Sequence, residues 1–113
     1  MSDDCLFCRI VRREIPATVI REDEHTLAFR DIDPKAPTHV LVIPKEHVAS
    51  LDDVHDPALV GRLFAAAREI AADEGIAQSG YRTVMNTGAD AGQTVFHVHL
   101  HLLGGRKLTW PPG

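Results

Sequence analysis

Long apolar runs and an excess of positive charge are both missing from this 113-residue sequence. No stretch reaches the roughly 20 apolar residues that a membrane-spanning helix needs, and the opening MSDDCLFCRI has no signal-peptide pattern. Lys and Arg number 12 against 16 Asp and Glu, so the net charge is −4 at pH 7. This balance excludes a broad basic surface for nucleic acid. We therefore expect a cytoplasmic protein whose partners are neither membranes nor nucleic acids. A local cluster of donors would still suffice for a small anion.

Cysteine and aromatic residues are scarce as well. Cys5 and Cys8 are the two cysteines, and aromatic residues make up 5% of the chain. In a reducing compartment, the spacing C-x2-C suits half of a zinc site or a redox pair better than a structural disulfide. Two thiols without any ligand would give the same pattern, so the cysteines alone leave these alternatives open.

The apolar residues predict one domain over residues 1–113, without a linker or an internal repeat, and long enough for a core of its own. A short helix is expected within residues 4–13, and a long one after Asp56-Pro57 that stops at Gly75. Runs rich in β-branched residues predict strands over 18–21, 26–30, 39–44 and 81–86, and a fifth near residue 100. Short turns between most strands indicate an α+β domain, with a mainly antiparallel five-stranded sheet, both helices on one side and an irregular tail over 105–113.

Three histidines in the segment GQTVFHVHLHLL are the most informative feature that is present. His97, His99 and His101 alternate with apolar residues, and this period of two is typical of a β-strand. Side chains two apart on a strand point to the same face, so we expect the three imidazoles to emerge together. The residues between them are expected to enter the core: Phe96, Val98, Leu100 and Leu102.

Such a row of imidazoles has three interpretations. It could be a strand with solvent-facing histidines, a zinc site, or a site for phosphoryl-group chemistry in which one imidazole attacks phosphorus. The preceding loop favours the third. It runs from Asn86 to Gly92 and continues into Gln93 and Thr94, and backbone amides, a side-chain amide and a hydroxyl are suitable donors to phosphate oxygens.

The same segment resembles the motif His-φ-His-φ-His-φ-φ, with φ apolar, of the histidine triad (HIT) superfamily of nucleotide hydrolases and transferases. The likeness extends over nearly the whole chain and is similar to the Hint branch, the histidine triad nucleotide-binding proteins. The segments that carry it are LFCRI, EIPA, LAFRDI, APTHVLVIPKEH, GYRTVMN and GGRKLTWPPG. The resemblance implies a homodimer whose sheet continues across both subunits.

By resemblance, His99 matches the nucleophile that takes the nucleotidyl group, and His101 matches a phosphate-binding residue. His97 and His39 match imidazoles that support the nucleophile. Expulsion of the amine needs a proton, which Thr94 could relay as a general acid. The resemblance also implies a nucleotide pocket. Asp31 matches the carboxylate that binds the ribose; the base slot would comprise Leu6, Phe7, Ile10, Phe29 and Ile32; Asn86, Gly92, Gln93, Thr94 and Val95 would surround ribose and phosphate; and Trp110 would reach toward the partner subunit.

Many bacterial HIT-like chains carry C-x2-C, and in them the two cysteines look like half of a zinc site that two histidines complete. The matching set here is Cys5, Cys8, His47 and His97, which would make a closed structural site; two buried thiols with a surface histidine is the alternative. No metal is expected to be needed for the chemical step.

The expected activity is hydrolysis of the P–N bond in purine nucleoside phosphoramidates such as AMP joined to an amine. Thr94 stands where Hint chains usually have serine and the fragile-histidine-triad dinucleotide hydrolases have threonine. A dinucleoside polyphosphate hydrolase is therefore an alternative, as are a zinc-dependent hydrolase and a nucleotide-sensing protein without turnover.

Overall fold

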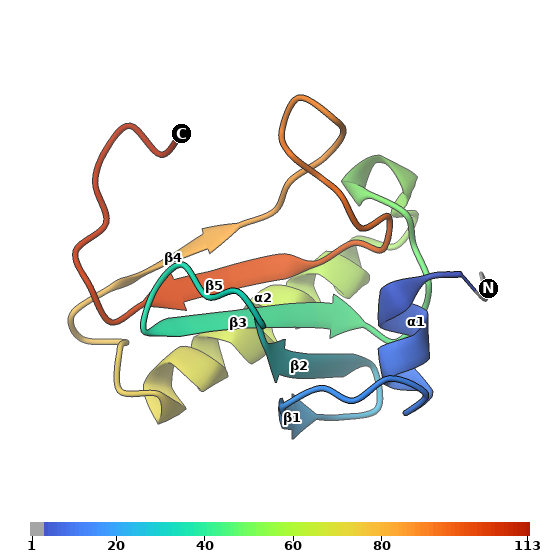
Figure 1. Cartoon of the computed structure of the whole chain (residues 1–113), viewed down its shortest axis with the longest axis horizontal. Coiled ribbons are helices and arrows are strands. Elements are labelled where there is room, and N and C mark those ends of the chain that lie inside the picture. Colours follow the sequence, from blue (N-terminus) through green and yellow to red (C-terminus); the bar gives the residue numbers. More distant parts are fainter. Residues whose placement is uncertain (1–3) are drawn as a thin grey trace.

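A computed structural model describes residues 4–113; the first three residues of the expected domain 1–113 lie outside the described part. Five antiparallel strands form one sheet in the order β1-β2-β3-β5-β4 (Figure 1). The strands are β1 (Val19–Glu22), β2 (Thr26–Arg30), β3 (Thr38–Pro44), β4 (Tyr81–Val84) and β5 (Leu100–Gly104). The helices are α1 (Leu6–Val11), a 3₁₀ turn (Leu51–Asp53) and α2 (Pro57–Asp73). The predicted α+β class, with one long and one short helix, is confirmed.

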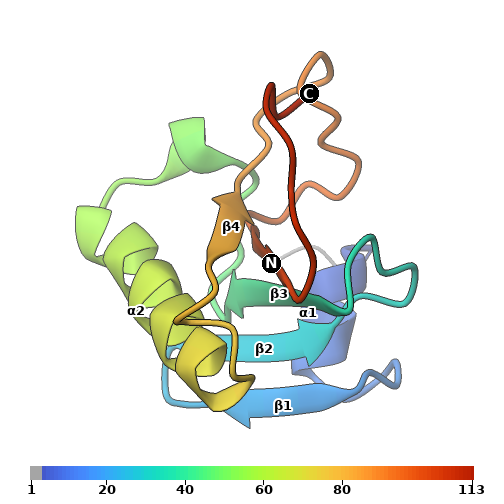
Figure 2. The same ribbon diagram turned by 90° about the vertical axis from the view of Figure 1, so that its left-hand side faces the viewer.

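The two helices lie on opposite faces of the sheet, which corrects the expectation that they share one side (Figure 2). Alternate residues of β2 and β3 explain the two layers. Ala28 and Val42 pair across the strands and face the cluster under α2, whereas Phe29 and Leu41 pair next to them and face α1. Because successive side chains of a strand alternate, the same strands supply both apolar layers.

Helix α2 begins and ends where the sequence predicts. The Asp56 carboxylate accepts a hydrogen bond from the backbone N–H of Ala58 at 3.0 Å, and Gly75 adopts φ +76° just after the helix. Leu63 and Ile70 lie on its fully buried side, while Phe64 is 45% exposed. Burying this face against β3 and β5 supplies the larger of the two cores.

The histidine segment is only partly a strand. Regular pairing with β3 begins at Leu100, and residues 93–99 are irregular. Val98, Leu100 and Leu102 are buried as predicted, but Phe96 is 59% exposed, so its expected place in the core is wrong. The alternation of a strand does not extend back to Phe96 because the backbone there leaves the sheet.

Strand β5 determines which face of the sheet carries the histidines. His101 lies opposite Leu41 of β3, on the α1 side of the sheet, and His39 is two residues before Leu41 on the same face. Strand β4 is an edge strand and ends at Val84, two residues earlier than predicted. Among the described residues, no helix combines the length and apolar character required to cross a membrane.

Candidate active site

Five imidazoles lie close together at the sheet's α1 face. Ring centroids are 5.0 Å apart for His99 and His101, 5.2 Å for His39 and His101, and 5.1 Å for His47 and His97. His97 and His99 are buried, at 0% and 8% exposure, and His39 is buried as well. The interpretation as a strand with solvent-facing histidines is therefore wrong.

The His99 ring has its hydrogen on the nitrogen that faces the protein. Its Nδ1 lies 2.7 Å from the carbonyl oxygen of His97, which can only accept, so Nδ1–H donates and Nε2 keeps a lone pair. Phe7 packs edge-on against the ring with centroids 5.1 Å apart. Burial lowers the pKa of His99, although the bond to the His97 carbonyl opposes this shift. A neutral imidazole with a free Nε2 can act as a nucleophile near pH 7.

The contact with His39 determines which ring nitrogen of His101 carries the hydrogen. The backbone N–H of Lys35 donates to His39 Nδ1 at 3.0 Å, which puts the His39 hydrogen on Nε2. That nitrogen lies 3.0 Å from His101 Nδ1 and donates to it, so His101 carries its own hydrogen on Nε2. Burial, followed by the neighbouring His99 and His39, lowers the pKa of His101 to about 4. His101 is thus a neutral donor whose Nε2–H suits a phosphate oxygen.

Asp31 lies next to the chain of hydrogen bonds that runs from Lys35 through His39 to His101, which we call the relay. Its Oδ2 lies 3.4 Å from His39 Nε2, and its Oδ1 accepts from the backbone N–H of Asp33 at 2.8 Å. Asp31, His39 and His101 are near enough to be a metal-binding group. The Lys35 N–H argues against that use, because it keeps the hydrogen on the His39 nitrogen that would have to bind the metal.

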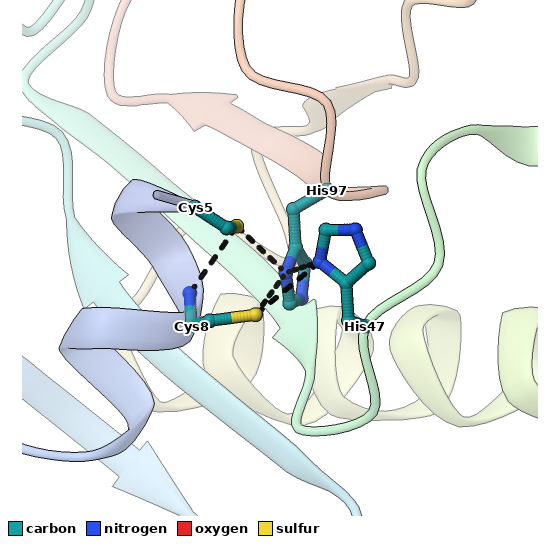
Figure 3. A group of neighbouring side chains, drawn as sticks. All are labelled: Cys5, Cys8, His47 and His97. Atoms are coloured by element: carbon teal, nitrogen blue, oxygen red, sulfur yellow. Dashed lines mark hydrogen bonds between the residues drawn. The ribbon is translucent and has the colours of Figure 1, made fainter. Parts of the chain in front are cut away.

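A second group joins helix α1 to two loops on the other side of His99. Cys5 caps the start of α1 and Cys8 lies in its first turn, while His47 follows β3 and His97 precedes β5 (Figure 3). The His97 Nδ1 is 3.4 Å from Cys5 Sγ, 3.5 Å from Cys8 Sγ and 3.3 Å from His47 Nδ1. Cys8 Sγ lies 3.2 Å from His47 Nδ1. The two sulfurs and two nitrogens therefore converge, as the sequence predicts.

These distances fit zinc. With Zn–S near 2.3 Å and Zn–N near 2.0–2.1 Å, the edges of a tetrahedron are about 3.3 Å between nitrogens and about 3.5 Å between nitrogen and sulfur. The His97 ring also has the required form, because its Nε2–H donates to the Pro44 carbonyl at 2.8 Å and leaves Nδ1 as a lone pair. Without a metal, burial and the neighbouring Cys5 raise the pKa of Cys8 to about 11, so its thiol stays protonated. Four protein ligands would fill the tetrahedron and leave no position for a reactant.

The structure places Gln93 differently from the sequence interpretation. Its side-chain N–H groups donate to the carbonyls of Ala49 and Val95 at 2.8 and 3.2 Å, and its Oε1 accepts from Gly88 N–H at 3.0 Å. This buried amide therefore has no free donor for phosphate. It fastens the loop before the triad to the segment that carries His47.

The remaining predicted site residues divide between core and surface. Phe7, Ile10 and Phe29 pack together in the smaller core, whereas Leu6 is 43% exposed and Ile32 is 99% exposed. Thr94 is exposed and lines a hollow of about 400 Å³ with Leu6 and Val95. Asn86 is half-buried, Gly92 is exposed with φ +91°, and Trp110 in the tail is 80% exposed.

Three partners of the histidines had no signal in the sequence because they are backbone groups. Lys35 N–H, Pro44 C=O and His97 C=O each determine which nitrogen of a ring carries hydrogen. Every residue offers these groups, so only the fold selects them.

This row of imidazoles, with Nε2 of His99 left free, is the arrangement expected of a histidine triad protein. The sequence profile of the HIT domain matches residues 12–108, and the chain belongs to this family. A HIT-like protein of Synechococcus elongatus is 55% identical over a 115-residue alignment that covers 100% of both chains. The purine nucleoside phosphoramidase of Escherichia coli K12 is 49% identical over 111 residues, covering 96% of this chain and 92% of that protein. The crystal structure of a HIT family hydrolase from Legionella pneumophila matches with a TM-score of 0.94 and 54% identity, covering 97% of this chain and 100% of that one.

Proposed function

We propose that this protein is a nucleotide hydrolase that cleaves the P–N bond of purine nucleoside phosphoramidates, of the type AMP joined to an amine, through a nucleotidyl-His99 intermediate. The observation that carries the proposal is the hydrogen bond from His99 Nδ1–H to the His97 carbonyl, which leaves Nε2 as the nucleophile. The 49% identity to the purine nucleoside phosphoramidase of Escherichia coli supports the choice of substrate class.

The reaction proceeds in two displacements. The His99 Nε2 lone pair forms a bond to phosphorus as the P–N bond breaks, and the amine leaves with its electron pair and takes up a proton. The positive charge on the nucleotidyl-imidazolium is stabilised because His99 Nδ1–H already points to a carbonyl oxygen. Water then attacks phosphorus, releases AMP and restores the neutral ring, so one difficult step is divided into two.

Neighbouring groups serve the phosphate and the leaving amine. His101 donates its Nε2–H to a phosphate oxygen, held in that form by His39. Thr94, an exposed residue that lines the hollow beside Cys5 and His47, relays the proton to the amine; general acid catalysis of this type is worth roughly 10²–10⁴-fold. Asp31 accepts from the ribose hydroxyls.

The purine lies over the apolar surface of α1 and β2, and the nucleotide-binding residues that complete the pocket are Leu6, Phe7, Ile10, Phe29, Ile32, Asn86, Gly92, Gln93, Thr94 and Val95. For Gln93 the proposed contribution is the shape of the loop, because its amide is already engaged. Ile32, 99% exposed in the single chain, gains apolar contact once a base is bound.

We also propose that the protein acts as a homodimer. Strand β4 is an edge whose outer side has no partner strand in the described chain, and a second copy would continue the sheet there. Tyr81 on this edge strand is exposed, as are Phe64 on α2 and Trp110 in the tail. The free thiols of Cys5 and Cys8 fit the reducing conditions of the cytoplasm.

Cys5, Cys8, His47 and His97 are proposed to hold a structural zinc. When bound, the metal ties α1 to the two loops and takes no part in bond breaking, because its ligand sphere is closed.

The test is to incubate the purified protein with adenosine 5′-phosphoramidate, stop the reaction in acid-free denaturant, and map the adduct by mass spectrometry. AMP release and an AMP adduct on a peptide at His99 are expected. Turnover with the adduct on another residue, or with none at any stopping time, would refute the covalent role.

Thr94 supports one alternative, a dinucleoside polyphosphate hydrolase, since threonine at this position resembles the fragile-histidine-triad branch. Comparing kcat/KM for P–N and P–O–P substrates in one assay separates the two. A higher kcat/KM for the P–O–P substrate would favour the alternative.

A further inference from the structure

His97 belongs to both chemical groups at this end of the sheet. Its ring nitrogen Nδ1 points into the group of Cys5, Cys8 and His47, and its carbonyl oxygen receives the hydrogen of His99 Nδ1. Only the few bonds between the His97 side chain and its own backbone separate the ring nitrogen in the thiol–imidazole group from the carbonyl that accepts from His99. A change in how the ring is held therefore acts on the carbonyl directly.

The His97–Val98 peptide is buried and is held by hydrogen bonds that lie outside the regular sheet. Residues 93–99 lie outside the regular strand, so the His97–Val98 peptide has no sheet ladder around it. Its N–H donates to the Val48 carbonyl at 2.7 Å, and its C=O accepts from His99 at 2.7 Å. Val48 itself follows His47 in an irregular segment. The peptide that orients His99 therefore connects two irregular segments, residues 93–99 and the segment of Val48. Each segment contributes one histidine, His97 or His47, to the thiol–imidazole group.

We propose that the Cys5–Cys8–His47–His97 group, when it holds zinc, positions the nucleophile: it fixes the His97–Val98 peptide and thereby keeps the hydrogen of His99 on Nδ1 and the lone pair on Nε2. The inference rests on the proposed function for its catalytic consequence, but its structural part concerns the His99 ring alone. His97 is a positioning residue in this view, and the four ligands act on catalysis without touching the substrate.

Removing zinc from the four ligands is expected to change how His97 and then His99 are held. With the metal gone, the His97 Nδ1 retains weak neighbours, two sulfurs at 3.4 and 3.5 Å and one nitrogen at 3.3 Å, in place of a coordination bond. The ring stays tethered through Nε2 to Pro44, and the peptide gains freedom to rotate. The His99 ring then loses a fixed acceptor, and both of its nitrogens can carry the hydrogen.

The experiment compares the full-length wild-type chain with Cys5→Ser. Serine keeps an acceptor for the Cys8 N–H that caps α1, but removes one thiolate ligand. Metal content is measured for both, and histidine ring nitrogens are observed by long-range ¹H–¹⁵N correlation near pH 7.5. His25→Gln, which changes an exposed turn histidine, serves as the matched control.

We expect one zinc per wild-type chain and a His99 ring with distinct protonated Nδ1 and bare Nε2 signals. In folded, zinc-depleted Cys5→Ser the two ¹⁵N shifts should move toward each other, and kcat should fall about tenfold or more, because losing the group that fixes the tautomer and orientation of a functional imidazole costs about 10- to 100-fold at comparable sites. Affinity for AMP should change less than kcat, since the four ligands do not themselves touch the substrate. His25→Gln should match the wild type in every measurement.

If Cys5→Ser fails to fold, a chelator titrated against the wild-type chain, followed by added zinc, gives the same comparison with a reversible signal. An unchanged His99 ring in folded, metal-free protein would overturn the proposal, and so would a wild-type chain that takes up no zinc. If the ring responds to zinc and no phosphoramidate is hydrolysed, the coupling holds and the proposed substrate is wrong.

Discussion

The relay from Lys35 through His39 to His101 can be tested by exchanging one ring nitrogen at a time. Asparagine in place of His39 keeps an acceptor near the position of Nδ1, where Lys35 N–H donates, but has no atom near Nε2. Glutamine instead places its amide near Nε2 and can still donate to His101 Nδ1. The two variants have similar size and neither carries a charge.

The magnitude follows from the buried acceptor that His39→Asn leaves. His101 Nδ1 loses its donor at 3.0 Å, and an unsatisfied buried polar group costs about 1–3 kcal/mol. Either this cost raises the free energy of the transition state, or the hydrogen of His101 moves from Nε2 to Nδ1. In the second case Nε2 no longer donates to phosphate. Both routes lower kcat/KM by about 5- to 150-fold. His39→Gln should remain within about fivefold of the wild type.

The assay is steady-state hydrolysis of an adenosine 5′-phosphoramidate with a fluorescent amine, with thermal unfolding measured beside it to confirm that both variants are folded. Equal losses in the two variants would show that His39 acts by bulk alone. Full activity in His39→Asn would refute the assignment of hydrogens along the relay.

Four further outcomes are expected. His99→Ala should abolish turnover while AMP affinity, measured by calorimetry, stays within about tenfold; substantial residual turnover would count against covalent catalysis. Because burial lowers the pKa of His99, and lowers that of His101 to about 4, kcat/KM corrected for uncatalysed hydrolysis should fall less between pH 7.5 and 5.5 than the roughly tenfold loss expected of a histidine with the ordinary value of 6.5. The lowered pKa values of His39 and His101 contribute stability that is present above pH 6.5 and is lost as the pH falls toward 4, so the free energy of unfolding should decline over that interval; a flat profile would contradict the burial argument. Leu102→Ala, at a fully buried position between the helices, should lower the free energy of unfolding in urea by about 2–5 kcal/mol.

Local signals in the sequence were sufficient for most of the fold. Asp56 and Gly75 mark the ends of α2 through their own backbone and capping chemistry, and the polar turn between β1 and β2 forms as Asp23 accepts two backbone N–H groups at 2.8 Å. Such features depend on residues near one another in the chain and are therefore readable from it.

The side of the sheet that a helix covers is a tertiary property. Both faces of β2 and β3 are apolar, so their sequences accept a helix on either side. Phe96 illustrates a second limit: the alternating pattern continues through it, but the chain turns toward the His47 loop before regular pairing starts. Periodicity indicates which side chains of a strand would share a face, but it does not indicate the residue at which the strand begins.

Within the candidate site, residue types were predictable and hydrogen positions were not. Spacing and resemblance together bring His97, His99 and His101 to one place and pair Cys5 with His47 and His97. The ring forms depend on backbone atoms from distant segments, such as Lys35 N–H, which no side-chain pattern encodes.

The amide of Gln93 has a consequence for what this position can tolerate. A glutamate there would have the same shape and differ by one terminal group, yet it would turn an oxygen toward the carbonyls of Ala49 and Val95 in a buried place. Two attractions would become two repulsions, and the loop that bears Gly88 would separate from its neighbour. Deamidation at this one side chain would therefore loosen the loop that precedes the histidines without altering a single histidine.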